Sequence, residues 1–164
     1  MHEDFPEIPS GLLDRWHGLL RNYADLLQLS VARVLRLQQG EWHLMSAAGP
    51  AADRLEDGPV PTQAPPFADE LVVAQKLVCR EAWSDQNFIL KHQEGERAAQ
   101  SYAGIPVYWP SGSLFGVLDA LNDAPRVFTD AERRLLVQIR DDIEDHLVLL
   151  HGNRADLVTN HVTR

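Results

Sequence analysis

Apolar stripes at helical spacing near both ends of the chain, with strand patterns between them, constrain the fold more than any other sequence feature. The first stripe follows Ser10, whose hydroxyl is placed to cap a helix N-terminus, and ends near Leu27. The second follows Thr129 and Glu132, which have the spacing of a capping box, and continues to Leu150. We therefore expect one amphipathic helix before the remaining elements and one after them.

Two hairpins are predicted between these helices. Alternating and β-branched residues over 30–45 are interrupted at Gln39-Gly40, which favours a turn between two strands. A second pair of strands over 103–121 turns at 110–113, and its mostly apolar composition predicts a central position in the sheet. Antiparallel strands between terminal helices indicate an α+β protein in which both helices pack on one face of one sheet.

The segment between the hairpins carries weaker signals. Five prolines in residues 49–66 predict a loop, either a tolerated surface insertion, which we favour, or a functional lid. Helical spacing predicts a middle helix over 67–83, followed by a short strand at 88–90 and a helical turn over 96–100. The middle helix and the loop are then left for the second face of the sheet, where they would enclose a cavity suited to a small molecule.

Length and charge limit the classes of function. A chain of 164 residues suffices for about one domain, predicted over 10–150 with an N-terminal tail at 1–9 and a C-terminal extension or linker at 151–164. Fifteen Lys and Arg against 24 Asp and Glu give a net charge of -9, which disfavours nucleic-acid binding and attachment to anionic membranes. No apolar run approaches the ~18 residues of a membrane span, and the acidic start is unlike a signal peptide. A cytoplasmic protein without membrane insertion is therefore expected.

Residues 101–116 carry the most specific motif, SYAGIPVYWPSGSLFG. This run resembles the signature of GAF domains, most closely the bacterial branch whose hairpin has Tyr-x-Gly-x-Pro, then Trp-Pro-x-Gly, then Phe-Gly. The helix start at 128–132 also resembles that of the closing helix of the family. The resemblance is specific over about 101–150 and poor over 49–100.

The resemblance implies a central antiparallel sheet of about six strands, terminal helices on one face and an enclosed ligand cavity on the other. It also implies bacterial signal transduction, because such domains usually precede a diguanylate cyclase, histidine kinase or PAS module and commonly dimerise through their terminal helices. No motif of such an output module is found in the sequence, so we expect an isolated sensory domain or the first part of a longer protein. Where the family often has a cysteine and a strand-ending aspartate, this chain has Asp119 and Asn122. The family's ligands are therefore not transferred to it, and no cofactor is assigned.

Strand alternation places Phe115, Val117 and Asp119 on the predicted cavity face. Gly116 falls on the opposite face, where it would let a helix approach closely. A carboxylate within an apolar strand needs a partner, so Asp119 is either satisfied by backbone amides, solvent or an arginine, or it contacts a ligand.

Aromatic residues gather around the same cavity, although core packing is the more frequent role of each, and Trp109 is expected to fix the hairpin turn. The ligand-binding candidates are Asp119, Val117, Phe115, Tyr108, Tyr102, Trp83, Phe88 and Trp42.

Histidine and cysteine give little support for a metal or redox site. No pair of histidines has zinc-site spacing, and His92 is more simply a solvated side chain than a haem ligand. Cys79 is the single cysteine, so no internal disulfide can form, and a buried thiol in the middle helix is expected. It lacks the following histidine of bilin-linking relatives. It also cannot alone supply the disulfide relay of the family's methionine sulfoxide reductases.

Four apolar residues of the last helix fall seven positions apart, which is the spacing of a coiled-coil seam. These dimer candidates are Leu136, Ile143, Leu150 and Leu157. The same stripe can instead cover the domain's own sheet, an alternative that explains the helix well as far as Leu147.

The favoured function is a non-catalytic sensory domain that binds a small, unknown ligand and shifts the arrangement of the terminal helices in a homodimer. The alternative is a dimerisation or protein-interaction module with a filled, ligand-free cavity. A third hypothesis, an enzyme that uses Asp119 as an acid or base, is the least favoured because no second catalytic group can be placed beside it.

Overall fold

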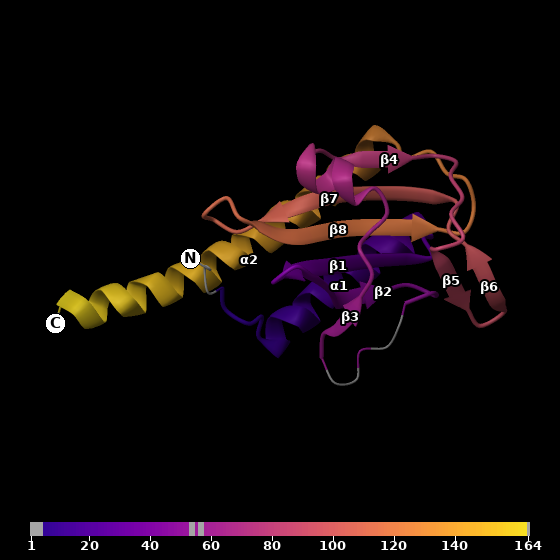
Figure 1. The fold of residues 1–164 in the computed structure, drawn as a ribbon. Helices are drawn as coiled ribbons and strands as arrows, with labels where there is room; N and C mark the ends of the chain where they lie inside the picture. The colour runs from indigo at the N-terminus through magenta and orange to yellow at the C-terminus, as the bar shows by residue number, and fades with distance from the viewer. Residues whose placement is uncertain (1–4, 53–54, 56–57, 164) are drawn as a thin grey trace.

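The computed structural model describes residues 5–52, 55 and 58–163, with side chains as far as His151. It contains a six-stranded antiparallel sheet in the order β3-β2-β1-β8-β7-β4 and a two-stranded ribbon, β5-β6. The elements are α1 (Ser10–Leu27), β1 (Val31–Gln38), β2 (Glu41–Ala48), β3 (Val60–Thr62), the π-helical turn η1 (Asp69–Val73), β4 (Val78–Arg80), β5 (Ile89–His92), β6 (Gly95–Ala98), β7 (Ser101–Tyr108), β8 (Leu114–Asn122) and α2 (Asp130–Thr163). Both helices lie on one face of the sheet, and α2 continues past the ends of the strands (Figure 1). The predicted α+β class and six-stranded antiparallel sheet are confirmed.

Helix α1 begins after a proline. The prediction of Ser10 as N-cap is wrong, because Pro9 holds that position with φ -60° and ψ 149° and makes no side-chain cap bond. The Pro9 carbonyl accepts hydrogen bonds from the amides of Leu12 and Leu13 at 3.0 and 3.1 Å. The proline ring restricts φ to this range, so the chain enters the helix from an extended residue with little conformational entropy to lose.

Helix α2 begins with the predicted capping box. The Thr129 amide donates to Glu132 Oε1 at 2.9 Å, and the Glu132 amide donates to Thr129 Oγ1 at 3.2 Å. These bonds satisfy two of the amides that a helix N-terminus leaves without partners. Burial raises the pKa of Glu132, but the hydrogen bonds from Thr129 and the charge of Arg126 outweigh burial and hold that pKa below its usual value. Neither α2 nor any other helix among the described residues is long and apolar enough to cross a bilayer.

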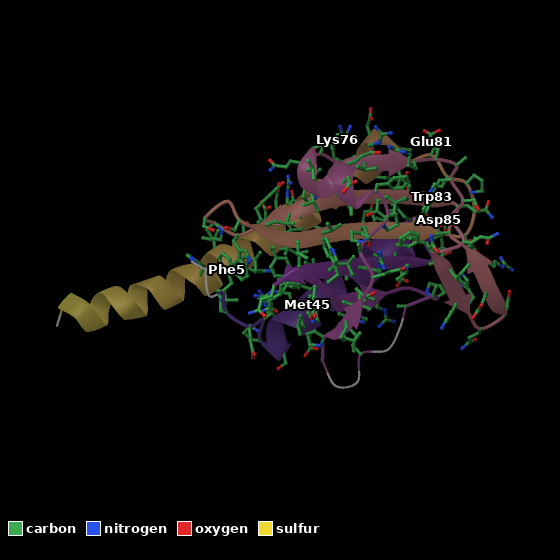
Figure 2. All side chains as sticks on the ribbon, viewed as in Figure 1. Phe5, Met45, Lys76, Glu81, Trp83 and Asp85 are labelled. Carbon is green, nitrogen blue, oxygen red and sulfur yellow. The ribbon has the colours of Figure 1, made fainter. Side chains whose placement is uncertain are left out.

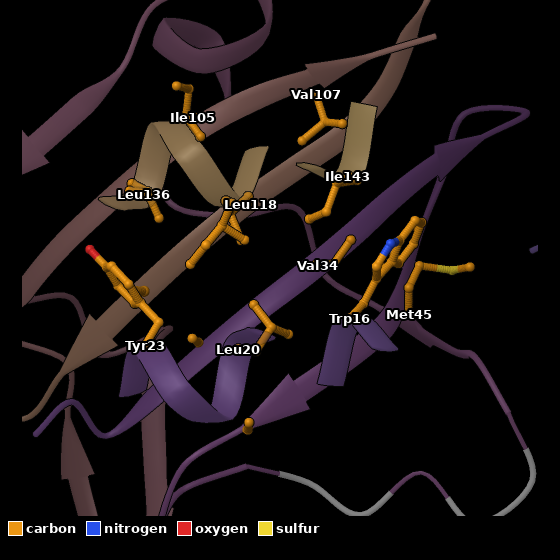
Figure 3. Packing of buried hydrophobic residues seen from close by; sticks show 14 of the residues in the cluster. Trp16, Leu20, Tyr23, Val34, Met45, Ile105, Val107, Leu118, Leu136 and Ile143 are labelled. Carbon is orange, nitrogen blue, oxygen red and sulfur yellow. The ribbon is translucent and has the colours of Figure 1, made fainter. Parts of the chain in front are cut away.

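The main core lies between the sheet and the two helices (Figure 3). Trp16 and Leu20 of α1 meet Val34 of β1, Leu118 of β8 and Ile143 of α2 there, and all five side chains are fully buried. Burying an aliphatic or aromatic side chain of this size contributes about 1.5–3 kcal/mol relative to leaving it exposed. This helix-face core therefore holds α1 and α2 on the sheet.

Both predicted hairpins are present. Strands β1 and β2 join at Gln39 and Gly40, whose φ values of 53° and 79° have the signs of a type I′ turn. The second hairpin is formed by β7 and β8, and β8 lies between β1 and β7 near the middle of the sheet. The apolar composition of this hairpin thus predicted its central position correctly.

The prediction of a middle helix over 67–83 is wrong. Phe67 and Gln75 have positive φ values of 57° and 55°, which interrupt a helical path on both sides of η1. The residues after Gln75 lead into β4, which pairs with β7 as one edge of the sheet. Cys79 accordingly lies in an edge strand rather than in a helix.

Short strands replace two other predicted features. The helical turn expected over 96–100 is wrong, because β6 pairs there with β5. The strand expected at 88–90 corresponds to β5, one residue later at its start. The loop predicted over 49–66 contains β3, which pairs with β2 as the other edge of the sheet.

Candidate functional site

The face of the sheet opposite the helices carries η1, and the β5-β6 ribbon lies at one end of the sheet (Figure 1). A second buried cluster lies on this face. Leu71 from η1 and Leu90 from β5 belong to it, together with Val31, Leu35 and Leu44 of the sheet. The sheet thus has a separate core on each face, and this second face is the place predicted for a cavity.

Four aromatic residues fill one part of this face. This aromatic group consists of Phe67, Trp83, Phe88 and Tyr102, with Trp83 labelled in Figure 2. The ring centroid of Phe67 lies 5.0 Å from that of Trp83 and 5.4 Å from that of Tyr102, and Trp83 lies 5.6 Å from Phe88. These are contact distances for aromatic pairs. Three predicted ligand-binding residues therefore pack mainly against one another.

A small cavity remains beside the aromatic group, with a volume of about 100 Å³. Its apolar wall includes Val31, Leu44 and Leu121, while Arg33 and Thr62 contribute polar atoms. Small-molecule pockets usually measure about 300–1,000 Å³, so this cavity accommodates only a small ligand.

A hydrogen bond joins two of the segments that border the cavity. Gln63, which follows β3 and lines the cavity, donates from Nε2 to the carbonyl oxygen of Asn87 at 2.9 Å. Asn87 directly precedes Phe88, which also lines the cavity. The β3 segment and the β5 segment are thus linked across the border of the cavity.

Asp119 is fully buried and forms an ion pair with Arg33. Arg33 Nε donates to Oδ1 at 2.9 Å and Nη2 donates to Oδ2 at 2.8 Å, while the Tyr102 hydroxyl donates to Oδ2 at 3.0 Å. Burial and the adjacent Asp119 carboxylate raise the pKa of Tyr102 well above its ordinary value, against the opposing charge of Arg33. Tyr102 is therefore a neutral phenol that donates its proton to the carboxylate. The arginine partner was among the alternatives that the sequence left open.

Of the eight predicted ligand-binding residues, Phe88 is the one that lines the described cavity. Val117 and Tyr102 are buried in the second-face cluster, and Trp42 and Trp83 pack against that cluster while partly exposed. These four residues pack in or against the second-face cluster but do not line the cavity.

The structure corrects the placement of Phe115. The register between β7 and β8 shifts at Val107 and Tyr108, so that Phe115 turns to the helix face. Its ring lies 5.8 Å from Trp16 and 5.4 Å from Trp109, which belongs to the same helix-face core. Phe115 therefore cannot contact a ligand in the cavity. Trp109 lies at the hairpin turn, where its amide donates to the Ser113 carbonyl at 2.8 Å and its carbonyl accepts from the Gly112 amide at 2.9 Å.

Tyr108 and Gly116 are also corrected. Tyr108 lies in neither buried cluster, and its amide donates to Glu144 Oε2 of α2 at 2.9 Å. Burial and the charge of Glu144 raise the pKa of its phenol, against the opposing charge of Arg140, so the side chain lies near α2. The close neighbours of Gly116 are backbone atoms of Leu35 and Arg36 in β1. Gly116 thus permits the approach of a strand and not of a helix.

The polar residues of the cavity wall, Arg33, Thr62 and Gln63, are not among the residues predicted from the sequence. Arg33 was detectable in principle, because it is a charged residue among the apolar residues of β1. Thr62 and Gln63 gave no signal, since they lie in a proline-rich segment predicted as a loop.

The four dimer candidates have different surroundings. Leu136 and Ile143 are buried in the helix-face core, so they pack on the chain's own sheet and are closed to a second copy. Leu150 is partly buried against the same core, and the side chain of Leu157 lies outside the described residues. For Leu136 and Ile143, the alternative interpretation of the stripe is the correct one.

Cys79 and His92 lie away from the cavity wall. Burial raises the pKa of the Cys79 thiol, against the opposing charge of Arg133. His92 Nε2 lies 3.5 Å from Asp123 Oδ2 at the end of β8. Among the described residues, no cluster of three or more His, Cys, Asp or Glu side chains is arranged to hold a metal ion.

A six-stranded antiparallel sheet with both terminal helices on one face and a cavity under connecting segments on the other defines a GAF fold. No protein-family model matches the sequence, and no curated protein gives a significant match. Solved structures do match. The chain is similar to the GAF domain from an Acinetobacter phosphoenolpyruvate-protein phosphotransferase, with a TM-score of 0.65 and 20% identity, covering 86% of this chain and 84% of that one.

Two further structures show the range of proteins with this fold. The PixJ GAF domain of Thermosynechococcus elongatus, in its blue-light-absorbing form, has a TM-score of 0.70 and 16% identity, covering 97% of this chain and 99% of that one. The type II free methionine-R-sulfoxide reductase from Thermoplasma acidophilum has a TM-score of 0.56 and 14% identity, covering 85% and 96%. At these identities the likeness concerns the fold, and it confirms the GAF resemblance of residues 101–116 at that level.

Proposed function

We propose that the chain is a cytoplasmic, non-catalytic sensory domain in which a small molecule in the cavity alters the packing of α1 and α2. One observation carries the proposal: β1 lines the cavity and also belongs to the helix-face core. Val31 and Arg33 line the cavity, whereas Ala32 and Val34 between them are buried under the helices. A ligand that displaces β1 therefore changes the surface on which the helices pack, and it can favour one helix arrangement over another.

The surroundings of Asp119 support a non-catalytic role. The carboxylate is fully buried, and three donors from Arg33 and Tyr102 occupy its oxygens. A general acid or base must come within hydrogen-bond reach of the substrate proton, which these contacts prevent. Cys79 is the single cysteine of the sequence, so a disulfide relay within one chain cannot form on this GAF fold.

The size of the cavity restricts the ligand. A cavity of about 150 Å³ holds benzene, so about 100 Å³ suits a molecule of about six non-hydrogen atoms or fewer. A haem or a bilin is many times larger. We propose a small metabolite as the ligand and a homodimer joined along the end of α2 as the form that transmits the change.

A second candidate function is a protein-interaction module without a ligand. The aromatic group favours it, because Phe67, Trp83 and Tyr102 already fill much of the face on which a ligand would bind. The two candidates differ in whether the remaining cavity is ever occupied.

The test is an NMR screen of the full chain against molecules of about six non-hydrogen atoms or fewer. We expect amide shifts at Val31 and Leu44 in the cavity, accompanied by shifts at Leu136 in α2. Ala51→Leu, which fills the cavity, should abolish both sets of shifts, whereas Ala131→Leu on the exposed side of α2 should preserve them. Shifts confined to the cavity would contradict signalling through α2, and no shifts with any compound would favour the interaction module.

A further inference from the structure

We infer that the cavity selects an uncharged molecule with a small apolar body and one hydrogen-bonding group, such as a short-chain amide or alcohol. The inference rests on the proposed function, because it names the class of ligand for the same cavity.

The charge of the cavity wall is already balanced from within the protein. Among the described residues that line the cavity, Arg33 alone is charged, and two hydrogen bonds pair its guanidinium with Asp119. An anionic ligand at Arg33 would share the guanidinium with Asp119, which already balances its charge, and would place a second negative charge beside a fully buried carboxylate. A cationic ligand finds no carboxylate among the described residues of the wall. Either ion also loses its hydration on entry, so both are disfavoured.

The remaining wall favours a short carbon chain with a polar end. Val31, Leu44 and Leu121 present apolar surface, while Thr62 at the end of β3 and Gln63 directly after it supply polar atoms. A ligand with a single polar group can direct it toward this segment and keep its carbon atoms against the apolar wall. Such a ligand buries no unpaired charge, and its polar group keeps a partner.

The experiment compares isobutyramide with isobutyrate, which have nearly the same shape and differ in charge at neutral pH. Both are titrated into the full chain, with binding followed by the amide shifts of Val31 and Leu44. We expect isobutyramide to bind at least about tenfold more tightly than isobutyrate. Equal or tighter binding of isobutyrate would overturn the ligand class while leaving the proposed function intact. Failure of both probes and of every compound in the wider screen would overturn the class and the proposed function together.

Two charge variants test the role assigned to the ion pair. Asp119→Asn keeps the shape of the side chain but removes the charge that balances Arg33, so the preference should shift toward isobutyrate by at least about tenfold. Asp123→Asn removes the same charge from a surface pair with Arg97 and should keep the wild-type preference. An unchanged preference in Asp119→Asn would overturn the assignment of selectivity to the pair. If Asp119→Asn does not fold, the comparison of isobutyramide with isobutyrate on the wild-type chain still tests the ligand class.

Discussion

Arg33 of β1 and Asp119 of β8 are directly opposite each other in the sheet, and their side chains form an ion pair with two hydrogen bonds. Asp119 is fully buried and the Arg33 side chain is 14% exposed, so the pair has little access to water. Burial costs both groups their hydration, and the paired geometry offsets much of that cost. Removing one partner should therefore be more damaging than replacing both.

We expect Asp119→Leu and Arg33→Met each to lower the free energy of unfolding by about 3–5 kcal/mol, because each leaves a buried charge unpaired. The double variant should lose less than either single variant, since two apolar side chains need no partner. Urea unfolding of the four proteins measures the coupling. A double variant that loses the sum of the two single losses would contradict the pairing.

The contact between Gly116 and β1 gives a second prediction. A methyl group at 116 would overlap backbone atoms of Leu35 and Arg36, and these cannot move without disturbing the β1-β8 ladder. Gly116→Ala should therefore destabilise the protein by about 1–3 kcal/mol or more. Gly18→Ala in α1 meets no atom within 4 Å and should instead stabilise by about 0.5–1 kcal/mol, through helix propensity. Denaturant unfolding of both variants measures these changes. An unchanged free energy of unfolding in Gly116→Ala would refute the close approach of β1.

Local patterns predicted the parts of the fold that local interactions determine. The capping box at Thr129 and Glu132, the positive-φ turn at Gln39-Gly40 and the apolar stripes of both helices depend on residues near one another in the chain. The middle segment was mispredicted because β4 owes its conformation to β7, about 24 residues later in the sequence, and not to its own periodicity. Strands of three residues also carry too short a pattern to compete with a helical one.

The candidate site was only partly predictable for a similar reason. The need of Asp119 for a partner follows from its place in an apolar strand, but the choice of Arg33 depends on the register between β1 and β8, 86 residues apart. The register shift near Tyr108 reversed the face of Phe115, and strand alternation alone cannot show such a shift. The cavity itself depends on how the β3 and β5 segments meet, which no local pattern specifies.

Homodimerisation along α2 is the third prediction. Val148 and Leu149 are 49% and 63% exposed and directly follow the buried Leu147, so they offer apolar surface on the outer side of α2. We expect sedimentation velocity to show a dimer that Leu149→Asp converts to a monomer. Leu26→Asp, at a 71% exposed position of α1, should leave the dimer intact. A monomeric wild-type chain would contradict the prediction, as would an unaffected Leu149→Asp variant.

A hydrogen bond between the two helices makes stability depend on pH. Trp16 is fully buried and its Nε1 donates to Nδ1 of His146 in α2 at 3.1 Å, so the neutral imidazole carries its proton on Nε2. Burial and then the charge of Arg15 lower the pKa of His146 below its ordinary value of 6.5, against the opposing charges of Asp142 and Asp145. Protonation turns Nδ1 into a donor and removes the acceptor of the Trp16 indole.

The sign of the pH effect follows from this lowered pKa. The unfolded chain binds a proton at His146 more readily than the folded chain, so the stabilisation is fully present above pH 6.5 and decreases as the pH falls through that value. We expect the unfolding free energy of the wild type to fall more between about pH 8 and pH 5 than that of His146→Gln, because glutamine can accept from Trp16 without titrating. Urea unfolding across this range measures both proteins, and parallel pH profiles would show that the Trp16–His146 bond does not control the dependence.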